Sequence, residues 1–370
     1  MKNLRIAIFS PNQNPYSETF IQAHKNYLKG CVFYYYGKRK VIELEGQRAL
    51  TSRFRQFLLK AEKLFFKKSP TFVTEEMVLT SLKKNAVEVV LAEYGTHAHN
   101  ILPVVKKAGL PLVVHFHGFD ASVLNAIKRC HHYREVFQYA KKVIAVSKKM
   151  HQMLLEIGCP PEKLVYNVYG PRSEFMDVQC TFSKNQFVAV GRFTDKKAPY
   201  YTILAFKEVL KRYPHATLVL GGDGVLVNSC KNLVKLYKLE ESIHFLGVIT
   251  SEKYIQLLKE SLAFVQHSIT ADNGDMEGTP LSILESSAAG LPVIATDHAG
   301  ISDVILHQET GLLCKEHDVQ GMSQNMLQLL EDKELAKTLG ANGKKRIKEH
   351  FSLSRHISKL QKILQEAADS

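Results

Sequence analysis

The sequence lacks the features that mark membrane-spanning and secreted chains. No apolar run approaches the roughly 18 residues that a spanning helix needs. The opening MKNLRIAIFSP has a short apolar run but neither the longer apolar region nor the small-residue cleavage site of a signal peptide. Hydrophobic residues make up 45% of the chain and charged residues 23%, as in ordinary soluble globular proteins. We therefore expect a cytoplasmic protein.

Paired cysteine motifs are also lacking, which argues against a zinc knuckle or a dithiol redox site. We expect free, buried thiols at the scattered cysteines: Cys31, Cys130, Cys159, Cys180, Cys230 and Cys314.

The chain has no excess of negative charge, because its net charge is +13. The excess of positive charge is unevenly distributed along the sequence. Residues 1–180 hold 27 Lys and Arg against 14 Asp and Glu, whereas residues 181–370 hold 22 of each. A basic half of this kind predicts a polyanionic partner, which could be nucleic acid, anionic lipid or a phosphorylated substrate.

At 370 residues the chain is long enough for two domains, each with its own core, and two domains imply a cleft. Apolar runs of strand length alternate with segments of helical period in both halves, which predicts parallel sheets covered by helices. We expect strands at residues 6–10, 32–37, 87–94, 111–118, 142–147 and 163–168 in the first half, and at 187–191, 216–224, 243–247, 262–268 and 292–297 in the second. Helical segments include residues 17–28, 96–108, 148–157 and most of 318–366.

The fold class predicted from this rhythm is α/β, with two Rossmann-like, doubly wound domains in tandem. A polar stretch at 178–186 is interpreted as the linker. The expected domains are therefore residues 1–180 and 181–350, followed by a terminal helix, 351–370, that could return to the N-terminal domain.

The stretch EGTPLSILE, residues 277–285, places one glutamate just before an expected helix and a second inside it. Thr279 suits the N-cap and Pro280 the first helical position. The free N–H groups and dipole of such a helix end favour a phosphate or diphosphate, and carboxylates on either side can bind the paired hydroxyls of a sugar and a ribose. A capped helix with two solvated glutamates is the simpler alternative.

Three further segments follow expected strands of the second half. GRFTDKK, residues 191–197, supplies Arg192 and Lys197, two cations that could neutralise a diphosphate. GGDG at 221–224 and HFLG at 244–247 are backbone-exposing loops able to approach a flat base. Ligands bind beyond the carboxyl ends of strands in such sheets, so these segments are expected to share one site.

These residues resemble the retaining glycosyltransferases of the GT-B fold, family four. The resemblance covers nearly the whole chain, and its most specific part is EGTPLSILESSAAGLPVIATDHAGISDVI, which is similar to that family's motif of two glutamates separated by seven residues. NPYSETFI at 14–21 and HFHGFD at 115–120 are similar to first-domain segments of members that build bacterial surface polysaccharides. The chain departs from the family at 167–171, where NVYGP replaces an Asn-Gly-x-Asp turn and leaves the hinge geometry open.

The resemblance implies catalytic roles for residues of both halves. Glu277 would bind hydroxyls of the donor sugar, and His117 would approach the transferred sugar near its anomeric carbon. Arg192 and Lys197 would hold the diphosphate and stabilise the leaving group.

It implies donor-binding roles as well. Glu285 would bind the ribose hydroxyls of the nucleotide. Backbone of the 277–285 motif and of the loops after the strands would face phosphates, sugar or base, and the first-domain loop would face the cleft; these residues are Gly278, Thr279, Pro280, Leu281, Gly222, Phe245, Leu246, Ser17 and Glu18.

Histidines at 97, 99, 115, 117 and 132, with Cys130, invite a metal interpretation, but their spacing matches no known ligand motif. We expect no metal and no cofactor. The absence of an Asp-x-Asp motif also argues against the metal-dependent, single-domain glycosyltransferase architecture.

Residues 51–70 form a candidate amphipathic helix with an apolar stripe and basic flanks. This segment could lie on an anionic membrane, which would suit a lipid-linked acceptor, or it could pack on its own sheet with a solvated basic face.

The resulting hypothesis is a retaining hexosyltransferase, peripheral at the inner face of the membrane, that moves sugar from a nucleotide donor, with UDP favoured, to a polysaccharide or lipid-linked glycan. Two alternatives stay open. One is a nucleotide-sugar epimerase of the same architecture, and the other is a nucleic-acid-binding protein, although no nucleic-acid motif is present.

Overall fold

The computed structural model describes residues 3–15 and 18–370 and divides the chain into two compact units. Unit 1 is built from residues up to 146 together with 150–167 and 357–370, and unit 2 from 147–149 and 168–356. Ser17 lies outside the described residues.

The division after residue 167 precedes the linker expected at 178–186. The intervening segment belongs to unit 2 because it packs there. Phe175 meets Tyr254 edge to face, with ring centroids 5.5 Å apart, and the Cys180 thiol donates to the carbonyl oxygens of Leu258 and Ala289.

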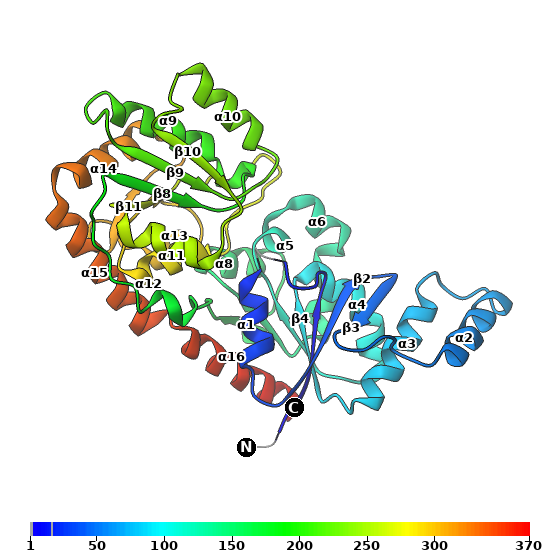
Figure 1. Ribbon diagram of the computed structural model, residues 1–370. Coiled ribbons are helices and arrows are strands. Elements are labelled where there is room, and N and C mark those ends of the chain that lie inside the picture. The colour runs from blue at the N-terminus through cyan, green and yellow to red at the C-terminus, as the bar shows by residue number, and fades with distance from the viewer. Residues whose placement is uncertain (1–2, 16–17) are drawn as a thin grey trace. The chain divides into compact units, whose positions relative to one another are not determined.

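The described part of unit 1 contains a seven-stranded sheet in the order β3-β2-β1-β4-β5-β6-β7 (Figure 1). Its strands are β1 Arg5–Ser10, β2 Cys31–Lys38, β3 Val41–Leu44, β4 Val89–Glu93, β5 Leu112–His115, β6 Lys142–Ala145 and β7 Leu164–Tyr166. All neighbours pair in parallel except β3, which forms an antiparallel hairpin with β2.

The sheet of unit 2 has six strands among the described residues, all parallel, in the order β10-β9-β8-β11-β12-β13. They are β8 Gln186–Val190, β9 Thr217–Gly221, β10 Ile243–Gly247, β11 Ala263–Gln266, β12 Val293–Thr296 and β13 Gly311–Cys314. Every expected strand is present, whereas β3 and β13 were not predicted. Both are four-residue strands at the edge of their sheets.

The helices connect these strands in the alternating manner that the sequence predicts. They are α1 Thr19–Tyr27, α2 Arg53–Phe65, α3 Phe72–Lys84, α4 Gly95–Ala108, α5 Phe119–Ser122, α6 Leu124–Arg129, α7 Arg134–Tyr139, α8 Lys148–Glu156, α9 Pro199–Leu210, α10 Val227–Leu236, α11 Ser251–Glu260, α12 Leu281–Ala289, α13 Ile301–Val304, α14 Val319–Glu331, α15 Lys333–His350 and α16 Leu353–Ala368. Short 3₁₀ turns are η1 His131–Tyr133, η2 Pro161–Lys163, η3 Ser173–Phe175 and η4 Asp195–Lys197.

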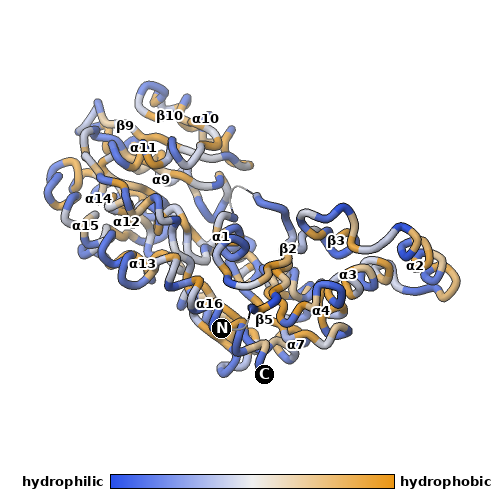
Figure 2. Tube along the Cα trace, turned by 60° about the horizontal axis from the view of Figure 1, so that its bottom comes forward, coloured by the Kyte–Doolittle hydropathy of each residue, from blue (hydrophilic) through white to orange (hydrophobic). Residues whose placement is uncertain are grey.

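The central strands of both sheets are buried on both faces, as parallel strands covered by helices should be. In unit 2, α9 packs with α14 on one side of the sheet, while α12 packs with α15 on the other (Figure 1). Figure 2 shows the apolar residues as orange stretches along strands and helices alike. Among the described residues, no helix is both long and apolar enough to cross a bilayer.

The order of strands reverses at β8, which has β9 on one side and β11 on the other. Loops that leave the carboxyl ends of strands at such a reversal separate to opposite faces, and the resulting crevice is where doubly wound sheets bind ligands. The candidate residues of unit 2 are therefore sought beyond β8, β9 and β11.

Candidate functional site

The loops after β8 and β9 are held together by their backbones. Gly191 N–H donates to the Gly221 carbonyl at 3.0 Å, and Phe193 N–H donates to the Asp223 carbonyl at 2.9 Å. Gly222 has a φ of +129°, and a Cβ there would lie 1.9 Å from the Gly191 carbonyl oxygen. Glycine at 222 is thus required for this close approach, which brings the two predicted segments into one site.

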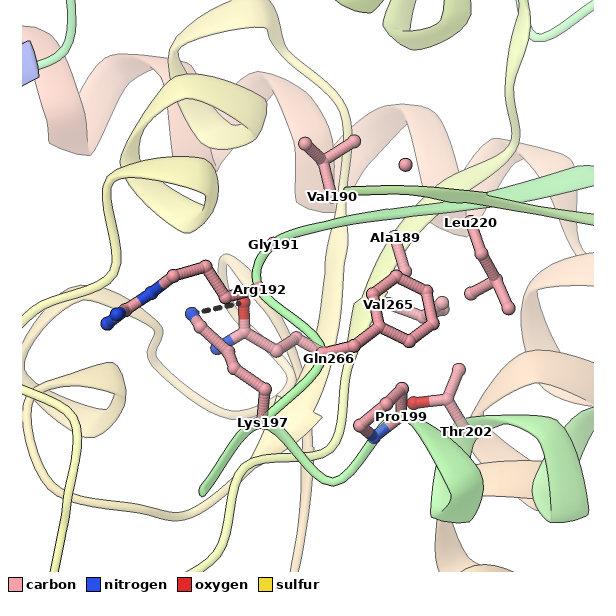
Figure 3. Close-up of a pocket in the computed structure, with 12 residues that line it drawn as sticks. Ala189, Val190, Gly191, Arg192, Lys197, Pro199, Thr202, Leu220, Val265 and Gln266 are labelled. Atoms are coloured by element: carbon pink, nitrogen blue, oxygen red, sulfur yellow. Dashed lines mark hydrogen bonds between the residues drawn. The ribbon is translucent and has the colours of Figure 1, made fainter. Parts of the chain in front are cut away.

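A small pocket of about 30 Å³ opens beside this junction (Figure 3). Its apolar lining comes from side chains such as Phe193, Leu220 and Val265, and its polar side from Arg192, Lys197 and Gln266. Figure 3 shows Arg192 and Lys197 reaching the same side of the pocket. Arg192 is exposed, whereas Lys197 is only 14% exposed.

Lys197 lies at the end of η4 and joins the first predicted glutamate. Its Nζ lies 3.0 Å from Oε1 of Glu277 and 3.3 Å from Oε1 of Gln266, which is the last residue of β11. The same Glu277 oxygen accepts the Ser268 hydroxyl at 3.3 Å. The structure therefore brings together Lys197 and Glu277, which the sequence predicts as parts of one site.

The charges of this pair are set by burial and by each other. Burial alone would raise the pKa of Glu277, but Lys197 and then Lys196 outweigh it and hold the pKa at about 2. Burial lowers the pKa of Lys197, and Glu277 partly restores it. The 3.0 Å contact between the ammonium and the carboxylate favours the charged form of both groups.

The helix that carries the second glutamate begins one residue later than predicted. Pro280 occupies the cap position with extended backbone and Leu281 is the first helical residue, so the predicted placement of Thr279 at the N-cap is wrong. The fixed φ of proline suits this extended position as well as a helical one. Gly278, Thr279, Pro280 and Leu281 still form the N-terminal end of α12, where free N–H groups favour an anion.

Glu285 lies at the middle of α12 and faces a cation that the sequence analysis did not select. The Nε atom of Arg172 lies 3.5 Å from Glu285 Oε1, and the same guanidinium contacts Glu174 and the Ser251 hydroxyl. Burial is the dominant effect and raises the pKa of Glu285 to about 7, although Arg172 opposes it. Glu285 therefore changes charge near neutral pH.

The predicted base-binding residues lie on β10, at the edge of the unit 2 sheet. The Phe245 ring lies 6.0 Å from that of Phe193, and the Lys231 amine lies 5.9 Å from the Phe245 centroid. Leu246 is exposed. The Gly247 carbonyl accepts the Gly222 N–H at 2.6 Å, so the end of β10 is joined to the loop after β9.

In unit 1, His117 follows β5 and is bound to a buried carboxylate. Nε2 of His117 lies 2.8 Å from one oxygen of Glu93, the last residue of β4, and Nδ1 of His24 lies 2.6 Å from the other. Burial lowers the pKa of His117 and raises that of Glu93, each opposed by the other group. Glu18 accepts the Tyr94 hydroxyl at 2.8 Å, beside the same end of the sheet.

One group of potential metal ligands occurs among the residues that the structure describes. Donor atoms of His24, Glu93 and His115 lie within 4.8 Å of one another in the core of unit 1. Both Glu93 oxygens are already hydrogen-bonded to imidazoles, so hydrogen bonding accounts for the arrangement. His97 and His99, considered for a metal in the sequence, lie in the first turns of α4 and are not part of this group.

Several residues of the site escaped the sequence analysis. Arg172 and Ser268 sit in irregular segments whose neighbours in space are distant in sequence. Glu93 and Asp120 gave a signal in hindsight, because each is a buried acid at the end of an apolar run. The Asp120 carboxylate accepts N–H bonds from Gly95, His117 and Gly118 and so shapes the loop that carries His117.

Two family models match the chain in succession. The model Glycosyltransferase Family 4 matches residues 45–166, and the model Glycosyl transferases group 1 matches residues 178–346. The chain belongs to the GT-B glycosyltransferases of family four. The family named from the glutamate motif is thereby confirmed.

Two relatives are named for the biosynthesis of bacterial polysaccharides. The chain is 27% identical to the putative colanic acid biosynthesis glycosyltransferase WcaL of Salmonella typhimurium, over 57% of this chain and 53% of the relative. It is 28% identical to the amylovoran biosynthesis glycosyltransferase AmsK of Erwinia amylovora, over 68% of this chain and 64% of the relative. The matches thus span about half to two thirds of these relatives. A third relative, 24% identical over 69% of both chains, is the UDP-Gal:alpha-D-GlcNAc-diphosphoundecaprenol alpha-1,3-galactosyltransferase of Escherichia coli.

Solved structures share the fold over the whole chain. Anabaena HepE in complex with UDP superposes with a TM-score of 0.76, covering 98% of this chain and 100% of that one at 16% identity. A glycosyltransferase from Rickettsia africae gives 0.76, with 99% of both chains covered at 18% identity. The α/β fold of two Rossmann-like domains, GT-B, is confirmed.

Proposed function

We propose that this protein is a retaining glycosyltransferase that moves a hexose from a UDP-sugar to a polysaccharide or lipid-linked glycan. The observation that carries the proposal is the Lys197–Glu277 pair at the strand reversal of unit 2, beside the N-terminal end of α12. Charges of both signs next to free backbone N–H groups suit a sugar joined to a diphosphate.

On the donor side, each carboxylate has its own group to bind. Glu277 would accept hydroxyls of the sugar, and Glu285 those of the ribose, with the diphosphate on the end of α12 between them. The edge of β10, with Phe245 and Leu246, would take the base. UDP is favoured because HepE is described with UDP and the E. coli relative is named for a UDP-sugar.

In the transfer step the bond between the anomeric carbon and the phosphate oxygen breaks while a bond from the acceptor oxygen forms on the same face. The leaving phosphate takes the acceptor's proton, so no protein nucleophile is required. Arg192 and Lys197 would stabilise the negative charge that grows on the phosphate, the kind of preorganised electrostatic effect that dominates many enzymes. With two cations in that role the reaction is expected to need no metal and no cofactor. His117 would approach the transferred sugar, and Glu18 would take part in donor binding.

The decisive experiment is a calorimetric titration with UDP, GDP and ADP in EDTA, for wild type and Glu285→Ala. Micromolar binding of one nucleotide, lost roughly tenfold or more in the variant, would support the donor site. No binding to any of them would remove the basis of the proposal.

Product analysis separates the enzyme alternatives. Transfer with retention gives a glycoside whose anomeric configuration matches that of the donor sugar, which proton NMR of the product measures. A nucleotide-sugar epimerase would instead release a rearranged sugar without any acceptor. A salt-sensitive affinity for DNA that exceeds the affinity for every nucleotide would favour the nucleic-acid alternative.

We further propose that the protein works at the inner face of the membrane, in the cytoplasm, with α2 on anionic lipid. The alternative that α2 packs its apolar stripe on its own sheet is wrong, because α2 buries Leu59 while Leu64 is 84% and Phe65 87% exposed. Other exposed apolar residues are Phe54, Phe57, Leu58 and Phe66. Figure 2 shows orange and blue stretches alternating along α2.

Charge on α2 supports lipid as the occupant of this surface. Arg53, Arg55, Lys60 and Lys63 flank the apolar residues, and each basic residue near an anionic bilayer contributes about 1 kcal/mol. Aromatic rings with basic neighbours are typical of helices that lie in the interface plane.

Vesicle sedimentation tests this surface. The wild type should sediment with vesicles of phosphatidylcholine and phosphatidylglycerol, and Phe57→Ser with Phe65→Ser should not. A matched control is Val225→Ser with Leu236→Ser, which removes two exposed apolar side chains of unit 2. Equal sedimentation of both double variants, or loss of self-association instead of vesicle binding, would contradict the membrane role.

A further inference from the structure

We propose that His298 is a positioning residue for Glu277, and that Glu316 holds His298 in the tautomer that this task needs. The inference deepens the proposed function and rests on it, since Glu277 is taken there as a ligand of the donor sugar. All three residues belong to unit 2.

The first step is the bond that His298 makes. Glu277 lies in an irregular segment between β11 and α12, where its backbone N–H cannot join a ladder or a helix. Buried N–H groups need a partner, and this one donates to Nε2 of His298 at 3.2 Å. His298 is 2% exposed, so water does not compete freely for the contact.

The second step fixes the proton on the ring. A nitrogen that accepts a hydrogen bond carries no hydrogen, so the neutral His298 ring is protonated at Nδ1. Nδ1 lies 2.6 Å from Oε1 of Glu316, which is the group that this N–H donates to. Glu316 is held in turn by the backbone N–H of Thr270 at 2.8 Å.

The third step is a second contact from the same loop. A Cβ on Gly300 would lie 1.8 Å from the carbonyl oxygen of Gly278 and 2.5 Å from the Thr279 hydroxyl. The loop after β12 therefore touches two successive residues of the motif, Glu277 through an imidazole and Gly278 through bare backbone. Glycine at 300 is needed for the close approach.

The consequence concerns where the Glu277 carboxylate lies. The 3.0 Å contact between this carboxylate and Lys197 depends on the position of the Glu277 backbone, which the hydrogen bond to His298 holds in place. Without that acceptor the buried N–H is left unsatisfied, and the segment shifts to find another partner. A displacement of about 1 Å at a group that orients the substrate can lower the rate by about a hundredfold.

Nitrogen NMR of histidine-labelled protein tests the tautomer without any substrate. The resonance pair lost in His298→Phe belongs to His298, and it should show a protonated Nδ1 and an unprotonated Nε2 near neutral pH. In Glu316→Ala the pattern should move toward a mixture of tautomers. A ring protonated at Nε2, or at both nitrogens, would overturn the inference.

Ligand binding and kinetics then separate positioning from a merely structural role. In His298→Phe we expect about a tenfold loss in turnover of the UDP-sugar, with UDP affinity within about twofold of wild type, since UDP lacks the sugar that Glu277 binds. His307→Ala is the matched control, because His307 also accepts a backbone N–H, that of Leu313 at 2.9 Å, but is exposed.

The outcomes distinguish the two levels of the proposal. Equal losses of UDP affinity and turnover together with a lowered melting temperature would show that His298 is structural only. Failure of the wild type to bind any nucleotide would defeat the proposed function, whatever the tautomer is.

Discussion

Glu277 and Glu285 belong to one motif and are almost equally buried, at 8% and 7% exposed, yet their pKa values shift in opposite directions. Glu277 is held at about 2, whereas Glu285 rises to about 7. Burial favours the neutral acid at both positions, so the difference comes from the cations. Two lysines act on Glu277, with one ammonium 3.0 Å away, while a single guanidinium lies 3.5 Å from Glu285 and is shared with Glu174.

The comparison indicates how one motif can serve two tasks. A carboxylate that stays ionised next to a cation can receive a sugar and hold the charge balance beside a diphosphate. A carboxylate whose pKa is about 7 is only partly ionised near neutral pH when no ligand is bound, and it takes up full charge when hydroxyls arrive to stabilise that charge. Donor binding and proton release are then coupled at Glu285 and not at Glu277.

Removing Lys197, the cation that keeps Glu277 ionised, should have the largest effect on the transfer rate. We expect Lys197→Met to lower kcat about a hundredfold, equivalent to about 3 kcal/mol of lost transition-state stabilisation, and Arg192→Met to do the same. Steady-state transfer kinetics measure it.

Stability distinguishes the two variants. Lys197→Met leaves Glu277 buried without its partner and should lower the melting temperature, which Lys197→Met with Glu277→Gln should restore. Arg192→Met should melt like the wild type because Arg192 is exposed. Arg212→Met, in a surface pair with Glu331, is the control for losing an arginine, and a hundredfold loss there would discredit the electrostatic explanation.

Replacing each of the two glutamates by alanine is the next test. Glu285→Ala should weaken UDP by about 1.5 to 3 kcal/mol, while Glu277→Ala should leave UDP affinity near that of wild type and weaken the UDP-sugar instead. Calorimetry with both ligands decides, and equal effects of the two variants on UDP would mean that the assignment of ribose to Glu285 is wrong.

Two helical regions show most clearly how much of the structure can be predicted from the sequence. The sequence predicts an amphipathic helix at residues 51–70 and helical structure over most of 318–366, and the structure contains α2 in the first range and α14, α15 and α16 in the second. α16 buries Leu360 and Leu364, whereas α2 exposes Leu64 and Phe65. Periodicity predicts that one face is apolar, but what covers that face depends on segments distant in sequence.

The same limit applies to the site. Glu277, Glu285, Arg192 and Lys197 could be selected from the sequence because each follows a strand in a recognisable motif. Arg172 could not, since its contact with Glu285 joins the start of unit 2 to α12, and no spacing rule connects them. The pKa of Glu285 was equally out of reach, because it depends on burial and on that contact.

A pH titration of UDP affinity sharpens the comparison further. Because hydroxyls donate to the ionised form, binding through Glu285 is complete only well above pH 7 and falls as pH drops through the pKa of about 7. One unit below that value, about one carboxylate in eleven is ionised, so affinity should fall roughly tenfold. UDP's own phosphate also titrates, so the wild-type profile is compared with that of Glu285→Gln, in which this part of the slope should vanish. Parallel profiles for the two proteins would contradict the coupling.

Arg172 influences the pH at which UDP affinity falls, and we expect its replacement to have the smallest effect on that affinity. Arg172→Leu removes the positive charge that opposes burial at Glu285, so the pKa of Glu285 should rise further and the UDP profile should move to higher pH. At pH 7 a smaller fraction of Glu285 would then be ionised, which predicts a weaker affinity for UDP that alkaline pH restores. Recovery at high pH is the distinguishing result, because a guanidinium that bound UDP directly would leave affinity reduced at every pH.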